Sequence, residues 1–213
     1  MTKLVIIRHG HSMANMIRSF AGHTDAELSP VGEKQVVKTA EYVAENYKVD
    51  KIYASDLKRA YSTARAVSEK TGIEITPSEN LREIFAGEWE GRLFDDLLVE
   101  YPEDYGTWKN DIGNARCTGG EAVQELSARI LKEVEKIARE NDGKTVVIAT
   151  HATPVRCMER AWRGKTFDEM KDIPWVTNAS VTEAVYENGK FALSFAGKDE
   201  HLSDIATALP KNV

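Results

Sequence analysis

Four residues of types that bind and transfer anionic groups lie at the ends of predicted strands or at the start of a predicted helix. Arg8 and His9 follow the first apolar run of the chain, and His151 follows another. Arg59 lies in the first turn of the helix expected after a third strand. A guanidinium group presents a fork of N–H donors that suits phosphate, and a neutral imidazole can act as a nucleophile. The pattern favours a site where two arginines and two histidines meet one anion.

Each of these residues also has a plain structural explanation. Arg59 alone could be a solvated helix residue, and His151 could be a hydrogen-bonded histidine at a strand end. The sequence Arg8-His9-Gly10 is harder to explain by packing. A buried strand that runs into Arg-His, with a glycine that permits close approach of the backbone, gains nothing for the core. This segment therefore points most strongly to a function.

Buried apolar runs alternate with helix-period patterns along the chain, which is typical of an α/β layer architecture. The predicted strands are 4–7, 51–54, 73–76, 145–150, 181–186 and 191–195. The predicted helices begin at Ser29-Pro30, at Ser55 or Asp56, near Gly119-Gly120 and at Thr153-Pro154, with one or two short helices within 92–112. Asn188-Gly189 predicts a hairpin, so the expected fold is a three-layer α/β/α sandwich with a mostly parallel mixed sheet. Ligands bind outside the carboxyl ends of such strands.

Composition and charge exclude several classes of function. The chain has 213 residues, a one-domain length, with 28 basic and 34 acidic residues and a net charge of −6. Without a Lys/Arg block, a nucleic-acid partner is not expected. No apolar run approaches the roughly 20 residues of a membrane span, so we expect a soluble protein with no membrane partner. The start lacks the apolar core of a secretory signal, which predicts a cytoplasmic location. The spacing of Cys117 and Cys157 predicts free thiols.

Several segments together resemble the motifs of the histidine phosphatase superfamily, which has the phosphoglycerate mutase-like fold. The likeness covers nearly the whole chain. Residues 4–15 resemble the family's first strand and its R-H-G-x-[ST]-x-x-N motif, and residues 20–29 with Gly32 resemble its G-x-x-D-x-x-L-[ST]-x-x-G motif. Residues 55–64 resemble its S-x-L-x-R-[AT]-x-x-T-A helix start, and residues 81–91 resemble its L-x-E-x-x-x-G-x-W-E-G motif. Residues 147–151 with Arg156 resemble its second histidine motif.

The resemblance implies a role for each matching residue. His9 would be the nucleophile, Glu83 the proton donor, and Arg8, Arg59 and His151 the binding groups for the transferred phosphoryl group. The substrate-binding residues that it implies are Arg8, Ser12, Asn15, Gly22, Arg59, His151 and Ala152. No metal and no cofactor is expected, because the arginines and histidines supply the positive charge. Residues 1–213 would form one domain with a cap of loops and helices at about 85–120, and the family suggests a homodimer.

The chemistry of these residue types agrees with the implied roles. A nucleophilic imidazole must be neutral, and Arg8 and Arg59 would disfavour protonation of His9, while a backbone acceptor at its other ring nitrogen would fix the tautomer. An alkoxide leaving group needs a proton in the transition state, which a carboxylic acid such as Glu83 can supply. The sequence therefore predicts a metal-independent phosphomonoesterase that hydrolyses a small phosphorylated metabolite through a phosphohistidine intermediate.

The main alternative is a cofactor-dependent phosphoglycerate mutase that transfers a phosphoryl group at the same site. The segment 84–150 is short for the mutases of the family, and Thr118-Gly119-Gly120-Glu121 resembles a helix start of the phosphatase branch, which favours the phosphatase. His11 and Ala152 depart from the family pattern, where many relatives carry an acidic or amide residue and a glycine. Both departures could alter the fit or electrostatics of the pocket.

Two further classes stay open. The pair His9-x-His11 projects both rings to one face of an extended segment and could belong to a metallohydrolase, although Arg8 would repel the ion. A silent module that binds a phosphorylated partner is the other. Contacts with the leaving group are expected from 16–20 and 85–118. The candidates there are Arg18, Phe20, Tyr105, Trp108, Lys109 and Arg116.

Overall fold

Six strands form one mixed sheet in the computed structural model, which describes residues 1–207. The strands are β1 (Thr2–Arg8), β2 (Lys51–Ala54), β3 (Ile75–Pro77), β4 (Thr145–Thr150), β5 (Val181–Glu187) and β6 (Lys190–Lys198). Their order across the sheet is β3-β2-β4-β1-β5-β6. The first four strands in this order run parallel, while β5 and β6 are antiparallel to their neighbours. The predicted mixed sheet, with its hairpin at Asn188-Gly189, is confirmed.

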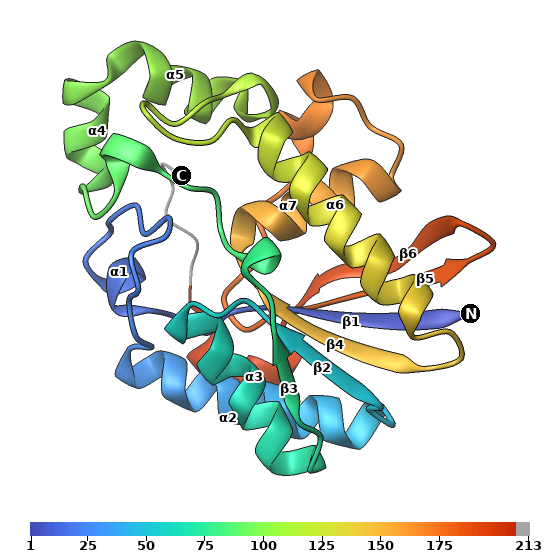
Figure 1. The fold of residues 1–213 in the computed structure, drawn as a ribbon. Coiled ribbons are helices and arrows are strands. Elements are labelled where there is room, and N and C mark those ends of the chain that lie inside the picture. The colour runs from blue at the N-terminus through green and yellow to red at the C-terminus, as the bar shows by residue number, and fades with distance from the viewer. Residues whose placement is uncertain (208–213) are drawn as a thin grey trace.

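Helices cover both faces of this sheet, as Figure 1 shows. One face carries α2 (Pro30–Asn46) and α3 (Lys58–Thr71), and the other carries α6 (Val123–Glu140) and α7 (Ala152–Trp162). The remaining helical elements are α1 (Met13–Met16), α4 (Phe94–Glu100), α5 (Pro102–Asn110) and the 3-10 turns η1 (Glu79–Leu81), η2 (Gly87–Trp89), η3 (Ile112–Asn114), η4 (Asp168–Asp172) and η5 (Glu200–Ile205). The predicted three-layer α/β/α sandwich is confirmed.

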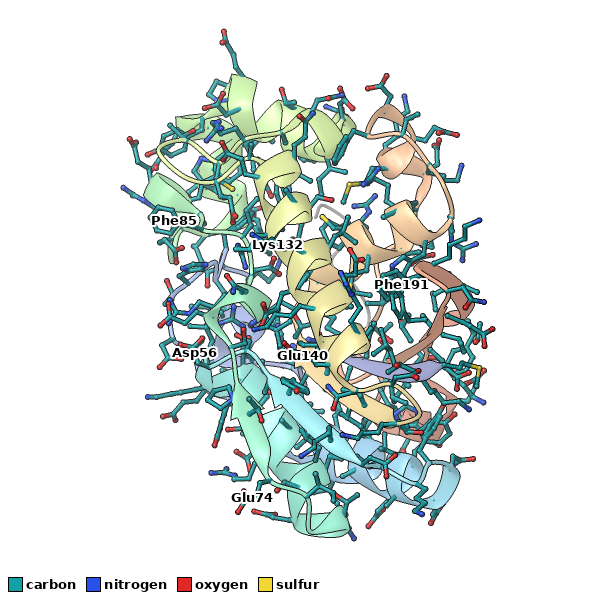
Figure 2. All side chains as sticks on the ribbon, turned by 45° about the vertical axis from the view of Figure 1, so that its right-hand side comes forward. Asp56, Glu74, Phe85, Lys132, Glu140 and Phe191 are labelled. Atoms are coloured by element: carbon teal, nitrogen blue, oxygen red, sulfur yellow. The ribbon has the colours of Figure 1, made fainter. Side chains whose placement is uncertain are left out.

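The central strand β1 is buried on both faces. Leu4 and Ile6 pack into the core beneath α6, whereas Val5 and Ile7 pack into the core beneath α2 and α3. This is why the strand reads as one continuous apolar run and does not alternate with polar residues. The helix α6 has one apolar stripe instead, and its outer face carries exposed charged side chains such as Lys132 (Figure 2).

Parallel pairing brings the carboxyl ends of three strands to the same edge of the sheet. Arg8 at the end of β1 is the register partner of Thr150 at the end of β4. Ala54 at the end of β2 pairs with Ala149. The residues that follow these strands therefore emerge side by side, although they are far apart in the sequence.

Two predicted helix starts are wrong. Neither Ser55 nor Asp56 caps α3, whose N-cap residue is Leu57 and makes no side-chain capping bond. The Ser55 hydroxyl bonds a histidine ring instead, and Asp56 forms an ion pair with Arg82. The N-cap residue of α7 is His151 and not Thr153, so the helix begins at Ala152, whereas its predicted end at Trp162 agrees.

Other boundaries agree or differ by a few residues. Ser29 caps α2 as predicted, since its hydroxyl accepts the Gly32 N–H at 3.2 Å, with Pro30 in the first turn. Both β3 and α6 begin a few residues later than predicted, at Ile75 and Val123.

Among residues 1–207, no helix has the length and apolarity needed to cross a bilayer.

Candidate active site

A pocket of about 670 Å³, counted out to its open mouth, lies at the carboxyl ends of the parallel strands. Its polar end consists of Arg8, His9, Arg59 and Glu83. Its aromatic wall consists of Phe20, Phe94, Trp108 and Trp175. The pocket therefore joins a charged end to an apolar one.

Most of the predicted site residues meet in this pocket. Those that line it are Arg8, His9, Asn15, Gly22, Arg59, Glu83 and Ala152. The other two, Ser12 and His151, lie behind the lining and are fully buried. Ser12 hydrogen-bonds Asn15, and the ring of His151 contacts the ring of His9.

The ring of His9 is held in one tautomer. Its Nδ1 lies 2.7 Å from the Gly10 carbonyl oxygen, which can only accept, so Nδ1 carries the proton and Nε2 keeps its lone pair. Burial lowers the pKa of His9 well below 6.5, and the charges of Arg59 and Arg8 lower it further. His9 is thus a neutral imidazole, as a nucleophile must be.

The two pocket arginines are buried without an acidic partner. Arg8 Nη1 donates to the Val176 carbonyl, while Arg59 donates from Nη1 and Nη2 to the carbonyls of Thr24 and Gly22 at 2.9 and 2.8 Å. Neither forms a salt bridge with any carboxylate of residues 1–207, and the Nε of each has no hydrogen-bond partner there. Burial lowers the pKa of Arg8 to about 10 and also lowers that of Arg59. The nearby charge of Glu83 acts on both pKa values in the opposite direction, but two buried cations without a direct ion pair remain costly unless an anion joins them.

His151 stands directly behind His9. The two rings meet edge to face with centroids 5.1 Å apart. Nε2 of His151 lies 2.9 Å from the Ser55 hydroxyl, while Nδ1 is buried with no partner among the described residues. Burial lowers the pKa of His151 well below 6.5, and the charge of Arg59 adds to the shift. Ser55 is a site residue that sequence reasoning assigned to a helix cap.

Glu83 is fixed by backbone donors. Oε1 accepts the N–H of Ile84 at 2.8 Å, and Oε2 accepts the N–H of Thr153, in the first turn of α7, at 3.3 Å. Glu83 is 9% exposed and forms no salt bridge with residues 1–207, so it is not an ion-paired residue of a surface loop. Its carboxyl group therefore faces the pocket from the side of α7.

A small amide network supports the start of α1. Ser12 caps this helix, and its hydroxyl lies 3.0 Å from Oδ1 of Asn15. Asn178 donates from Nδ2 to the same Oδ1 at 3.2 Å and to the His9 carbonyl at 3.1 Å. Asn178 lies in a segment without regular periodicity, so no sequence signal pointed to it. Ser12 therefore helps to place Asn15, which lines the pocket.

Gly22 accommodates a close approach that no other residue allows. Its φ is +47°, and a Cβ there would lie 2.2 Å from Oε1 of Glu90. The same carboxylate oxygen accepts the His23 N–H at 2.8 Å, and Oε2 accepts the Thr24 N–H at 2.7 Å. Glu90 thus fixes the loop whose carbonyls hold Arg59.

His11 points away from the pocket. Its Nδ1 lies 2.8 Å from the Ser29 hydroxyl at the start of α2, and it is not a lining residue. No three His, Cys, Asp or Glu side chains converge as metal ligands within the described part of the chain. Cys117 and Cys157 are both buried free thiols, as predicted.

The leaving-group candidates divide into two sets. Phe20 and Trp108 line the pocket. The four that do not are Arg18, Tyr105, Lys109 and Arg116, and of these Arg116 pairs with Glu125 at 2.6 Å. Sequence reasoning missed Trp175, which lies outside the segments expected to contact the leaving group.

Comparisons with known proteins agree with this geometry. The sequence profile of the histidine phosphatase superfamily (branch 1) matches residues 4–198. Phosphoserine phosphatase 1 of Hydrogenobacter thermophilus is 32% identical over 164 residues, 77% of each chain. The structure of Bacillus stearothermophilus YhfR superposes with a TM-score of 0.91 at 27% identity, covering 95% of this chain and 100% of that one. Phosphoserine phosphatase of Entamoeba histolytica with 3-phosphoglyceric acid gives 0.82 at 25% identity, covering 95% and 100%. The chain therefore belongs to the histidine phosphatase superfamily and is a phosphatase.

Proposed function

We propose that this chain is a metal-independent phosphomonoesterase that hydrolyses a small phosphorylated metabolite through a phosphohistidine at His9. The observation that carries the proposal is the neutral ring of His9 beside Arg8 and Arg59, two buried guanidinium groups without a carboxylate partner among residues 1–207. A phosphoryl dianion would supply the direct ion pairs that both guanidinium groups lack and satisfy the free Nε donors.

The reaction would proceed in two displacements. Nε2 of His9 attacks phosphorus, the bond from phosphorus to the ester oxygen breaks, and that oxygen takes the proton of Glu83. Water then attacks the phosphohistidine, gives its proton to Glu83, and releases inorganic phosphate and a neutral His9. Arg8 and Arg59 stabilise the charge that spreads over the equatorial oxygens in both transition states.

His151 would bind one of these oxygens. If the Ser55 hydroxyl donates to Nε2, then Nδ1 carries the ring proton and has no partner among the described residues. A phosphoryl oxygen is the acceptor that the proposal provides for it. The neutral state of His151 follows from its burial and from the nearby charge of Arg59.

Named relatives support hydrolysis as the outcome. They include phosphoserine phosphatases and the adenosylcobalamin/alpha-ribazole phosphatase of Escherichia coli, which is 30% identical over 149 residues. The phosphoglycerate mutase-like protein 4 of Arabidopsis thaliana, 27% identical over 205 residues, keeps phosphoryl transfer as the competing outcome.

The deciding experiment compares the wild type with His9→Ala on p-nitrophenyl phosphate in the presence of EDTA, and traps the phosphoenzyme by quenching. We expect full wild-type turnover with EDTA, a phosphoenzyme that is labile in acid and stable in base, and no turnover in His9→Ala. His201→Ala, which removes an imidazole stacked on Tyr42 away from the pocket, is the control. Appreciable turnover by His9→Ala would refute the mechanism, and a bisphosphorylated primer that drives isomer exchange faster than phosphate release would establish a mutase.

A further inference from the structure

The aromatic wall defines the part of the substrate that remains after phosphate is removed. We propose, on the basis of the phosphatase function above, that the natural substrate is a phosphomonoester with an apolar, flat leaving group. An amino-acid or short carboxylic-acid leaving group does not fit this wall. The inference deepens the proposed function by naming its substrate class.

Charge is confined to one end of the pocket. Among residues 1–207, the charged or titratable side chains that line it are those of the polar end, Arg8, His9, Arg59 and Glu83. The neutral polar residues Asn15, Ser19 and Thr153 complete the hydrophilic part of the lining. An ammonium or carboxylate group on the leaving group would lose its water at the aromatic wall without gaining an ion pair.

The aromatic wall is packed before any ligand arrives. The ring of Phe20 lies 5.0 Å from that of Trp108 and 6.1 Å from that of Phe94, each pair edge to face. Trp108 in turn lies 6.3 Å from Trp175. Phe20, Phe94 and Trp108 are at most 9% exposed, so a ring that enters the pocket meets side chains that already pack against one another.

One arginine stacks on Trp175 and a second bonds the backbone of the next residue. The Arg156 guanidinium stacks over its ring at 4.3 Å from the centroid, and Nη2 of Arg156 donates to the Met170 carbonyl at 3.0 Å. Arg8, from the polar end, donates to the carbonyl of Val176, the next residue in the chain. Arg8 therefore lines the polar end and also bonds the backbone beside the aromatic wall. Arg156 acts as a positioning residue for Trp175.

The test compares alkyl phosphates, because aryl esters react faster through their better leaving groups. The esters are 2-phenylethyl phosphate, ethyl phosphate, phosphoserine and 3-phosphoglycerate. Burial of a phenyl group should raise kcat/KM for 2-phenylethyl phosphate about 10- to 100-fold above that for ethyl phosphate. We expect phosphoserine and 3-phosphoglycerate to be hydrolysed no better than ethyl phosphate.

Two variants locate the effect. Trp175→Ala should reduce the ratio of kcat/KM for 2-phenylethyl to ethyl phosphate at least fivefold, with a smaller reduction in Trp175→Phe. Trp162→Ala is the matched control, since Trp162 is also half-buried but stacks on Phe191 outside the pocket, and it should leave the ratio unchanged. If Trp175→Ala does not fold, the ranking of the four esters by the wild type and the Trp175→Phe ratio still decide.

The inference is overturned if the wild type hydrolyses phosphoserine or 3-phosphoglycerate as efficiently as the phenylethyl ester, or if the ratio does not respond to Trp175. Failure of the proposed function looks different, because then no ester is hydrolysed in a way that depends on His9. That result would remove the inference as well.

Discussion

Nε2 of His151 lies 2.9 Å from the hydroxyl of Ser55, the residue that directly follows β2. This bond links the ends of β2 and β4, two strands that pair in the sheet, and orients the fully buried imidazole. Because Nδ1 of His151 has no partner among the described residues, the Ser55 hydroxyl is the hydrogen-bonding group that anchors the ring.

Replacing Ser55 with alanine should therefore lower kcat by about tenfold, which corresponds to about 1.4 kcal/mol, the size of one ordinary hydrogen bond. We expect the loss mainly in kcat, because the charges that bind phosphate stay in place. Ser68→Ala is the control, since it removes a serine hydroxyl that bonds the Ile73 carbonyl at the far end of α3. Wild-type kcat in Ser55→Ala would show that the bond does not position the ring.

Acid should destabilise the fold through its buried imidazoles. The pKa values of His9 and His151 are lowered well below 6.5 in the folded protein, chiefly by burial. Below pH 6.5 both imidazoles bind a proton in the unfolded chain but not in the folded protein. Stability is therefore retained above this pH, and as pH falls the free energy of unfolding decreases by about 1.4 kcal/mol per pH unit for each imidazole. Urea unfolding between pH 7.5 and 5 measures the slope of the free energy of unfolding against pH. This slope should be smaller for His151→Gln by the contribution of one imidazole. Parallel slopes for the two proteins would contradict this account.

Much of the polar end could be predicted because it depends on local sequence and on sheet pairing. Arg8 and His9 follow a strand that is buried on both faces, and parallel register alone brings them level with the end of β4. The positions of Arg59 and Glu83 were implied by the family motifs, and both line the pocket.

The rest depends on tertiary contacts that leave no periodic signal. Ser55 has the residue type of a helix cap, and only the fold shows that its hydroxyl hydrogen-bonds the ring of His151 instead. Asn178 and Trp175 lie in the irregular segment between η4 and β5, which is held beside the pocket by hydrogen bonds from Arg8 to the Val176 carbonyl and from Asn178 to the His9 carbonyl. Backbone carbonyls accept these bonds whatever their side chains, so the sequence does not indicate which segment will be held.

Glu83→Gln should separate good from poor leaving groups. An alkyl ester needs a proton on its departing oxygen, so its first turnover should slow by about 10²- to 10⁴-fold, whereas nitrophenolate leaves without help. The measurement is the rate of the first turnover for ethyl phosphate and the nitrophenol burst for p-nitrophenyl phosphate. Glu79→Gln, on an exposed carboxylate of η1, serves as the control. Equal losses for both esters would exclude Glu83 as the proton donor.

Arg59 should connect phosphate binding to stability. Inorganic phosphate at 100 times its dissociation constant should stabilise the wild type by about 2.7 kcal/mol, because phosphate binds only the folded state. Arg59→Ala should lose most of this stabilisation together with about 10³-fold in kcat/KM, since a buried charge at the reacting group is removed. Arg65→Ala, on the exposed side of the same helix, should keep both. Denaturant unfolding with and without phosphate gives the answer, and a persistent phosphate effect in Arg59→Ala would rule out the assignment.

A side chain at Gly10 should destabilise the fold, because the space beside this residue is already filled. A Cβ at Gly10 would lie 2.6 Å from Cγ1 of Val36 and 3.0 Å from the Gly32 carbonyl oxygen. Gly10→Ala should therefore reduce the free energy of unfolding by about 1–3 kcal/mol. Combining it with Val36→Ala removes the closer clash, so the double variant should lose at least about 1 kcal/mol less than the sum of the two single losses. Gly106→Ala in α5, where a Cβ meets no atom within 4 Å, should be neutral or stabilising by up to about 1 kcal/mol. Strict additivity of the two single variants would mean that Val36 is not what excludes a side chain at Gly10.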